Sequence, residues 1–354
     1  MKIVTVIGAR PQFVKAAVVS RWFEKYSGIV EIIIHTGQHY DVNMSDVFFE
    51  EMRIPKPTYN LEVGGTSHGA MTGQQLEKIE SILFSEAPDY LLVYGDTNST
   101  LAGALAAAKM NIPVIHIEAG LRSFNKEMPE EINRILTDHM ADILLAPTSV
   151  AKENLISEGI SAEKIFVVGD VMYDAALYYK NICLKPDWFD TYKLKVNEFV
   201  LCTIHRADNT DNVESLNSIL RGLASTSMYV VLPLHPRTLH RINKFNISIP
   251  ANVCVVEPVG YLEMVWLEIN CKLVVTDSGG VQKEAYFHNK FCITLREETE
   301  WVELINSGYN VLVGADTSKI SEELECVKEF KSKNDDFYGT GNAGNHIVNL
   351  LRNL

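Results

Sequence analysis

The sequence predicts an α/β protein of two doubly wound domains that face a cleft, and three observations support this. Short, continuous runs of β-branched and other apolar residues alternate with longer helical patterns along the whole chain. Continuous rather than alternating hydrophobicity is typical of strands covered on both faces, as in parallel sheets. The length of 354 residues fits two domains of about 150 residues each.

The first series of apolar runs occupies roughly the first half of the chain. Helical segments such as Thr97–Met110 lie between the runs, which is the arrangement of βαβ units. The predicted strands are Ile3–Ile7, Val30–Ile34, Tyr90–Val93, Val114–Ile117, Ile143–Leu145 and Ile165–Val168.

A second series begins after the pattern changes near residue 170. Pro186–Lys195 is polar, aromatic and irregular, so we place the domain boundary between residues 170 and 196. The domains are then 1–170 and 171–340, with a short segment 341–354 after them. Ligands of such sheets bind beyond the carboxyl ends of the strands. The predicted strands are Phe199–Ile204, Tyr229–Leu232, Val253–Val256, Leu273–Thr276, Phe291–Thr294 and Val311–Val313.

The composition limits the partners and the compartment. A net charge of −13 disfavours nucleic acid and anionic membranes as partners. No segment has the ~20 apolar residues of a membrane span, and the strand-like start MKIVTVIG does not resemble a signal peptide. None of the six cysteines forms a CxxC pair. We therefore expect a cytoplasmic protein with reduced, buried cysteines.

The segment Gly8–Lys15 follows the first strand and is a candidate phosphate site. Pro11 suits the first turn of a helix, which places Arg10 and Lys15 near a helix N-terminus. Cations oppose the helix dipole there unless an anion lies between them. A solvated loop arginine and a surface lysine explain the pattern equally well.

Carboxylates cluster after the strands of the first half. Asp96 and Glu118 each end a strand, and Glu130 and Glu131 follow Pro129 at a helix start. Converging carboxylates can serve as acid and base. Asp96 could instead cap a helix, and acids are favoured in any first helical turn. Glu118 has no such structural explanation and is the strongest candidate.

Two segments of the second half are candidate diphosphate sites. Ser278, Gly279 and Gly280 follow a strand, and Glu284 lies one turn later, where it could accept from ribose hydroxyls. An ordinary N-cap by Asp277 or Ser278 is the alternative. His205-Arg206 ends the first strand of the second domain, which suits a diphosphate, but a structural histidine fits the pattern as well.

Two further patterns are misleading. Gly339–Gly344 matches GxGxxG but has no strand before it and no βαβ unit after it, so it is not a nicotinamide site. His35 and His39 have i,i+4 spacing, but Gly37 between them favours a loop, and no glutamate or cysteine has zinc spacing. We expect neither a metal nor a cofactor.

The ordered motifs resemble those of the UDP-N-acetylglucosamine 2-epimerases. The blocks are GARPQFVK, HTGQH, VYGDTNST, HIEAGLRS, MPEEINR, TDH, HR, LPLHP and TDSGGVQKEA, in the order typical of that family. The resemblance implies a glycosyltransferase-B-like pair of Rossmann-type domains, a homodimer, and a last helix near Ile347–Asn353 that returns to the first domain. The first domain then carries the catalytic acids and the second binds UDP.

The resemblance also assigns residues by motif. It implies that Asp96, Glu118 and Glu130 are the catalytic acids and that His205, beside Arg206, helps UDP to leave. The implied ligands of the UDP-sugar are Arg10, Lys15, Asp96, His205, Ser278, Gly279, Gly280 and Glu284.

Several positions depart from the usual family pattern. Trp301 stands where the family commonly has an arginine in TERPE, and Val259 and Met264 stand at the uracil-side Gln and Phe. GARPQF, NMSDVFF, HGAMTG and LREETEW look more like the branch that acts on UDP-2,3-diacetamido-2,3-dideoxyglucuronate. Both this sugar and UDP-N-acetylglucosamine therefore remain candidate substrates.

The implied chemistry is loss of UDP from C1 and removal of the C2 proton, followed by reprotonation of C2 from the other face and return of UDP. The implied purpose is synthesis of a surface polysaccharide precursor. No cofactor is needed. The alternatives are a hydrolysing epimerase that releases UDP and the free sugar, a glycosyltransferase on the same fold, and a nucleotide-sugar sensor.

Many members of the family require a second UDP-N-acetylglucosamine as an effector. By alignment of neighbouring motifs, the family's Gln and Arg of that site correspond to Asp41 and Ser67, whereas Gln38 and His235 are retained. An acidic residue and a lost arginine weaken an anionic site. We therefore expect no effector requirement.

Overall fold

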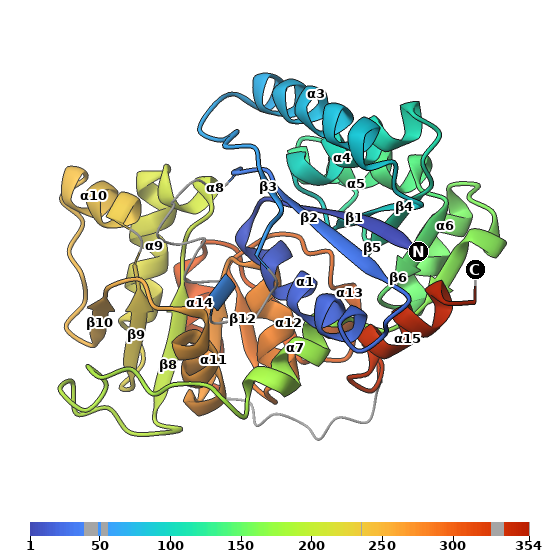
Figure 1. Ribbon diagram of the computed structural model, residues 1–354. Coiled ribbons are helices and arrows are strands. Elements are labelled where there is room, and N and C mark those ends of the chain that lie inside the picture. The colour runs from blue at the N-terminus through green and yellow to red at the C-terminus, as the bar shows by residue number, and fades with distance from the viewer. Residues whose placement is uncertain (39–48, 51–55, 235, 327–335, 354) are drawn as a thin grey trace. The chain divides into compact units, whose positions relative to one another are not determined.

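The computed structural model describes residues 1–38, 49–50, 56–234, 236–326 and 336–353 (Figure 1). Two compact α/β units are present: Met1–Ala175 with Asp336–Leu354, and Ala176–Asp335. Each unit contains one parallel sheet with helices between successive strands. The predicted fold class is confirmed, and all twelve predicted apolar runs contain strands.

The sheet of the first unit has the order β3-β2-β1-β4-β5-β6-β7. The direction of strand addition reverses between β1 and β4, which is the topological switch point where doubly wound sheets bind ligands. The central strands are almost free of solvent contact. The bounds are β1 Lys2–Ile7, β2 Val30–His35, β3 Tyr59–Asn60, β4 Tyr90–Tyr94, β5 Val114–Ile117, β6 Ile143–Ala146 and β7 Ile165–Val167.

Helices cover both faces of this sheet. Figure 1 shows α3, α4 and α5 on one face and α1 and α15 on the other. The helices of this unit are α1 Arg10–Phe23, α3 His68–Glu86, α4 Asn98–Lys109, α5 Pro129–Met140, α6 Ser149–Ser157 and α15 Ala343–Leu351, with a 3₁₀ turn at Ala162–Lys164. Helix α7, Val171–Tyr179, contains the point at which the chain passes from the first unit to the second.

The last helix of the chain packs closely against the first. A Cβ at Gly344 would lie 2.6 Å from the Trp22 ring of α1, so only glycine allows this approach. The Asp174 carboxylate accepts the backbone N–H groups of Ala343 and Gly344 at 2.9 and 2.8 Å, which caps α15. The glycines of the GxGxxG sequence thus form the turn into this helix.

The sheet of the second unit has the order β10-β9-β8-β11-β12-β13, again all parallel. The direction of strand addition reverses at β8, which pairs with both β9 and β11. The bounds are β8 Phe199–Thr203, β9 Tyr229–Pro233, β10 Val253–Val256, β11 Leu273–Thr276, β12 Cys292–Thr294 and β13 Asn310–Leu312.

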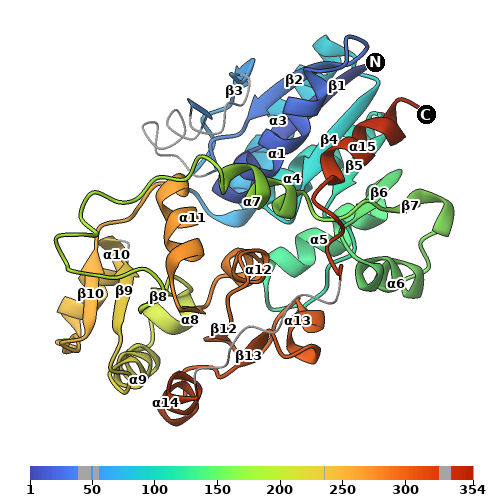
Figure 2. The ribbon, with the colours of Figure 1, turned by 90° about the horizontal axis from the view of Figure 1, so that it is seen from below.

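Helices also cover both faces of the second sheet. Figure 2 shows α9 and α14 on one face and α11 and α12 on the other. The helices are α8 Ala207–Thr210, α9 Val213–Leu223, α10 Pro236–Lys244, α11 Tyr261–Asn270, α12 Gly279–Phe287, α13 Val302–Asn306 and α14 Thr317–Glu325.

The irregular stretch before β8 belongs to the core of the second unit. Phe189 and Leu194 are buried, and the Phe189 ring lies 4.9 Å from the Trp266 ring on α11, centroid to centroid. The aromatic residues that gave the stretch its unusual composition therefore anchor it to the second sheet.

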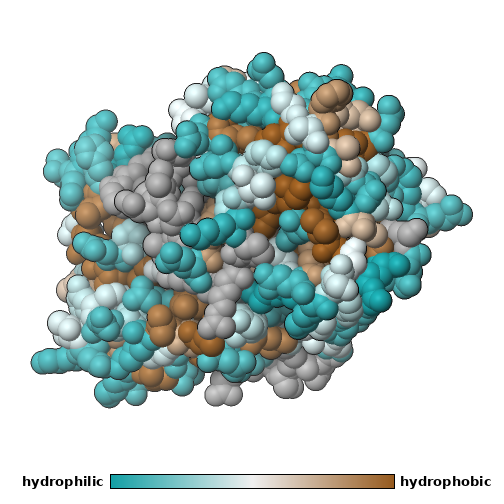
Figure 3. All heavy atoms as spheres, in the orientation of Figure 1, coloured by the Kyte–Doolittle hydropathy of each residue, from teal (hydrophilic) through white to brown (hydrophobic). Residues whose placement is uncertain are grey.

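The surface seen in Figure 3 carries hydrophobic residues in small groups among hydrophilic ones. None of the helices in the described residues is both long and apolar enough to cross a membrane.

Candidate functional site

The predicted residues lie in two groups, one at the carboxyl edge of each sheet. In the first unit they follow β1, β4 and β5, and in the second they follow β8 and β11. The strands β1 and β4 flank the switch point of the first sheet, with β5 next to β4, and β8 and β11 flank that of the second. Each group is therefore where a doubly wound sheet places its ligand.

The side chain of Gln12, a residue that we did not predict to have a function, fixes the loop after β1 by hydrogen bonds. Its carboxamide oxygen accepts the N–H groups of Gly8 and Ala9 at 2.8 and 3.0 Å. Its amide donates to the Tyr94 carbonyl and to Thr100 Oγ1, both at 2.9 Å. These two loop N–H groups are therefore already bonded within the protein.

Arg10 and Lys15 are the two cations of this helix start. Arg10 is the first residue of α1, with Pro11 after it, and its side chain lies outside the described part of the structure. Lys15 is buried, and its ammonium forms an ion pair with the Glu118 carboxylate. Lys15 and Glu118 are 103 positions apart in the sequence, so the local sequence pattern did not predict their pairing.

Glu118 occupies an unusual backbone position for its type. It leaves β5 with φ +73°, a left-handed conformation that non-glycine residues rarely adopt. Its N–H donates to the Leu145 carbonyl at 3.0 Å, and its side chain is buried beside Lys15. Backbone strain of this kind is concentrated at functional sites, which agrees with its choice as the strongest candidate.

Asp96 is not a helix cap, because Thr97 caps α4. The Asp96 carboxylate instead accepts from Arg134 at 2.6 Å and stays partly open to solvent. Arg134 also donates to Glu131 at 2.8 Å, and Glu131 is almost completely buried. Arg134 thus fixes the orientation of the Asp96 carboxylate, and part of the Asp96 side chain remains exposed to solvent.

Glu130 and Glu131 differ although they are adjacent in the first turn of α5. Glu131 points inward and accepts the N–H groups of Ser123 and Phe124 at 3.0 and 2.9 Å. It therefore has a structural function in the loop after β5. Glu130 is exposed at the start of the helix, so it is the member of the pair that solvent or a ligand can reach.

In the second unit, Asp277 organises the loop after β8. It is fully buried and accepts the backbone N–H groups of His205 and Arg206 at about 3 Å, and the Asn209 amide at 3.1 Å. Burial alone would raise the Asp277 pKa, but these bonds and the His205 ring at 3.1 Å lower it below its usual value. His205 is exposed and Arg206 half-exposed. Their orientation is fixed by Asp277 while their tips remain accessible.

The start of α12 is shaped for close approach of a ligand. Ser278 is the N-cap, and its hydroxyl accepts from Val281 N at 3.4 Å. Gly279 is half-exposed and Gly280 exposed. The Trp301 indole donates to the Gly279 carbonyl at 2.9 Å, and the Lys283 ammonium lies 4.0 Å from the Trp301 ring centre. Trp301 thus braces the backbone of this helix start.

Glu284 lies one turn further along α12. It is buried and accepts a hydrogen bond from the Tyr261 hydroxyl at 3.1 Å. Burial and the neighbouring carboxylates, Glu284 first, raise the Tyr261 pKa well above its usual value, so the hydroxyl stays protonated and donates. Val259 and Met264 are partly buried against the core of the same unit.

The remaining predicted positions border the loop after β1, precede α3, or fall outside the described residues. The His35 ring packs in a cluster with Phe13 and Phe49, tilted to the first and edge-on to the second, at centroid distances of 5.3 and 6.0 Å. Gln38 accepts from Ser99 N and Oγ at 3.1 and 2.8 Å. Ser67 precedes α3 as its N-cap residue. His39, Asp41 and His235 fall outside the described residues.

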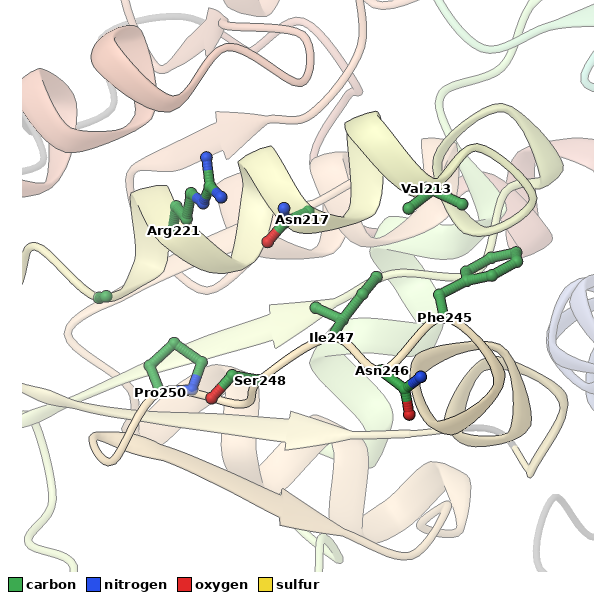
Figure 4. Close-up of a pocket in the computed structure, with 9 residues that line it drawn as sticks. Val213, Asn217, Arg221, Phe245, Asn246, Ile247, Ser248 and Pro250 are labelled. Carbon is green, nitrogen blue, oxygen red and sulfur yellow. The ribbon is translucent and has the colours of Figure 1, made fainter.

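Two other features of the described residues are separate from the candidate site. They contain no group of three or more His, Cys, Asp or Glu side chains suited to a metal ion. A groove of about 520 Å³ runs between α9 and residues 245–250, and Ile247 points toward the helix (Figure 4). None of the predicted residues lines it.

Comparison with known proteins identifies the family. The sequence profile of the UDP-N-acetylglucosamine 2-epimerases matches residues 22–352. The chain is 52% identical, over all of both chains, to the UDP-2,3-diacetamido-2,3-dideoxy-D-glucuronate 2-epimerase of Pseudomonas aeruginosa.

Solved structures agree with this result. One is the UDP-GlcNAc 2-epimerase of Methanocaldococcus jannaschii in complex with UDP-GlcNAc and UDP, with a TM-score of 0.92 and 43% identity over all of both chains. Another is the Neisseria meningitidis enzyme bound to UDP-GlcNAc, with a TM-score of 0.90 and 33% identity, again over both whole chains. The resemblance of the motifs is thereby confirmed, and the chain belongs to the UDP-N-acetylglucosamine 2-epimerase family, whose members are carbohydrate isomerases.

Proposed function

We propose that this protein inverts C2 of a UDP-linked 2-acetamido sugar without hydrolysing it. The observation that carries the proposal is the buried Lys15–Glu118 pair, with Asp96 at the end of the neighbouring strand β4. Strand ends hold these carboxylates on rigid elements, as acid–base chemistry requires. Family membership supplies the reaction class.

The first half of the reaction is an elimination. The C1–O bond breaks, and the β-phosphate oxygen of UDP takes the electron pair. The positive character left on the ring acidifies the C2 proton, which a carboxylate removes, and the C2–H electrons form the C1–C2 double bond. The products held in the site are a 2-acetamidoglucal and UDP.

The second half reverses these steps on the other face. A protonated carboxylic acid delivers a proton to C2 from the opposite side, and the UDP oxygen attacks C1 again. Each turnover therefore needs one base and one acid: the base ends protonated and the acid ends ionised, and proton exchange with solvent restores the starting state. We assign these proton transfers to Asp96, Glu118 and Glu130 together.

The diphosphate needs positive charge that strengthens as UDP leaves. We assign this function to Arg10, Lys15 and His205, with Arg206 beside it. The Ser278–Gly280 helix start adds backbone N–H donors, and Glu284 is placed to accept from the ribose. Because Lys15 pairs with Glu118, a phosphate that attracts Lys15 also alters the charge around the base.

We infer that UDP-2,3-diacetamido-2,3-dideoxyglucuronate is the substrate and that UDP-N-acetylglucosamine is the second candidate. The support is the 52% identity to the relative named for the first sugar, together with the departures at Trp301, Val259 and Met264. We further propose a cytoplasmic homodimer that makes a precursor of surface polysaccharides.

Incubation with each UDP-sugar alone in heavy water tests the proposal. We expect epimerised UDP-sugar with solvent deuterium at C2 and no net UDP release. Free sugar plus UDP would identify a hydrolysing epimerase, and no reaction without an acceptor would identify a glycosyltransferase. Epimerised product without deuterium at C2 would require an oxidation route and would refute the elimination mechanism.

A further inference from the structure

A chain of four buried or half-buried charged side chains leads to the carboxyl ends of β4 and β5. His116 and Asp138 are fully buried, with His116 Nδ1 2.7 Å from Asp138 Oδ1. Asp138 Oδ2 accepts from Arg122 at 2.7 Å. Arg122 in turn donates through Nε and Nη2 to the two oxygens of Glu158, both at 2.7 Å. None of these residues contributes to the proposed proton transfers.

The hydrogen bonds assign the charge of the His116 ring. Nε2 lies 2.8 Å from the Gly95 carbonyl oxygen, which can only accept, so Nε2 carries a proton. Nδ1 faces the Asp138 carboxylate, which also accepts from Arg122 and from Gly120 N at 3.1 Å. Asp138 is thus surrounded by three donors, one of them a guanidinium, which is the environment of an ionised carboxylate. Both ring nitrogens are therefore protonated, and His116 is an imidazolium.

The inner end of this chain contacts the backbone between the proposed catalytic residues. Gly95 precedes Asp96 and adopts φ +63°, and its N–H donates to the Ile117 carbonyl at 3.0 Å, next to Glu118. A Cβ at Gly95 would lie 2.9 Å from Lys15 Nζ and 3.2 Å from Glu118 Oε2. A small movement of Gly95 would thus displace Asp96 and the Lys15–Glu118 pair together.

We propose that His116, held as an imidazolium by Asp138, is a positioning residue that fixes the Gly95 carbonyl and so sets Asp96 and Glu118 for proton transfer. The inference rests on the proposed function of these carboxylates. Arg122 and Glu158 keep Asp138 ionised and immobile, and the four charges balance. An imidazolium in this place donates a charge-assisted bond, which is shorter and stronger than a neutral one.

The variants His116→Gln and Asp138→Asn test this inference in the full-length protein. Glutamine can still donate to the Gly95 carbonyl but carries no charge and has a different reach. The matched control is His288→Gln, because His288 is also buried and faces a buried carboxylate, Glu268, at 3.7 Å in the second unit. The readouts are thermal unfolding, UDP affinity, KM and kcat for epimerisation.

We expect His116→Gln and Asp138→Asn to lower kcat by about 10²-fold, the scale of a small misplacement of catalytic groups. KM and UDP affinity should change much less than kcat, because Lys15 is the one proposed diphosphate ligand beside Gly95, and Arg10, His205 and the Ser278–Gly280 helix start remain to bind UDP. His288→Gln should lose stability but keep kcat. Equal loss of kcat in the control, or unchanged kcat in both network variants, would overturn the inference.

Two further results keep the test decisive. If neither buried variant folds, Glu158→Gln at the half-buried outer end replaces them, and a kcat that equals that of the wild type then overturns the inference. If the wild type itself does not epimerise any UDP-sugar, the proposed function fails first, which is distinguishable from a failure confined to the variants.

Discussion

A half-buried carboxyl group on β2 makes the stability of the first unit depend on pH in an unusual direction. Glu31 accepts a hydrogen bond from Thr5 Oγ1 at 2.6 Å. Burial, with a smaller contribution from the Glu24 charge, raises the Glu31 pKa from 4.5 to about 7. Most native carboxylates have the opposite shift, and they stabilise a fold as pH rises.

The sign of the pH dependence follows from whether the folded or the unfolded chain binds the Glu31 proton more tightly. Between about pH 4.5 and about pH 7 the unfolded chain loses the Glu31 proton while the folded chain keeps it, so this group lowers stability as pH rises. Below that window it has no effect, and above it the full penalty applies. The difference between 4.5 and about 7 corresponds to about 3 kcal/mol. Partial contact with solvent reduces it toward about 1 kcal/mol.

The perturbation is Glu31→Gln, which keeps the acceptor for Thr5 and removes the charge. We expect the variant to exceed the wild type by about 1–3 kcal/mol in free energy of unfolding above about pH 7.5, and to equal it near pH 4.5. Urea unfolding of both proteins across this range, followed by tryptophan fluorescence and far-UV circular dichroism, measures the difference. Glu77→Gln, at an exposed position on α3, is the control. A stabilisation that does not change with pH would refute the assigned pKa.

The other predictions concern the site. Glu118→Gln should lower kcat by about 10²–10⁴-fold with little change in UDP affinity, whereas Arg10→Ala should weaken UDP binding in calorimetry; a normal kcat in the first variant would make Glu118 only a ligand. Gly8→Ala should destabilise the protein by about 1–3 kcal/mol, because its Cβ would lie 1.9 Å from Thr36 Oγ1; an unchanged melting temperature would contradict this. With the diacetamido-uronate, the initial rate should depend hyperbolically on substrate concentration without added UDP-N-acetylglucosamine. The reason is that Ser67 cannot supply the charge-assisted bonds of an arginine, which are worth about 1.5–3 kcal/mol each. A sigmoidal dependence would show an effector site.

The strands could be predicted because a doubly buried strand leaves a plain signal. Runs such as Ile3–Ile7 and Val114–Ile117 are apolar at all but one position, which few other structures require. β3 was missed because two residues, Tyr59 and Asn60, carry no periodicity. The stretch 186–195 was interpreted as a boundary, since its anchors act through tertiary contact rather than through a repeating pattern.

The sequence predicted a member of the candidate site only where no simpler structural function, such as capping a helix, explained the residue. Glu118 stood out for that reason, and its catalytic function stays a prediction. Its partner Lys15 was chosen as a phosphate ligand, because a pairing across 103 positions leaves no local trace. We did not predict Asp138, because it lies within a helix, where an aspartate is common for several structural reasons. We did not predict His116 because it lies within a strand. Asp277 was interpreted as a possible helix cap, yet it binds the loop that carries His205.

The packing of α15 against α1 has a consequence for how the chain can be cut. The first unit is discontinuous in sequence, since it combines residues 1–175 with 336–354, whereas the second unit is one uninterrupted stretch. During synthesis the first unit therefore lacks the helix that covers Trp22 until some 160 further residues have been added. A fragment that ends near residue 175 leaves that face of α1 bare, so expression of the second unit alone is the better route to an isolated half of the enzyme.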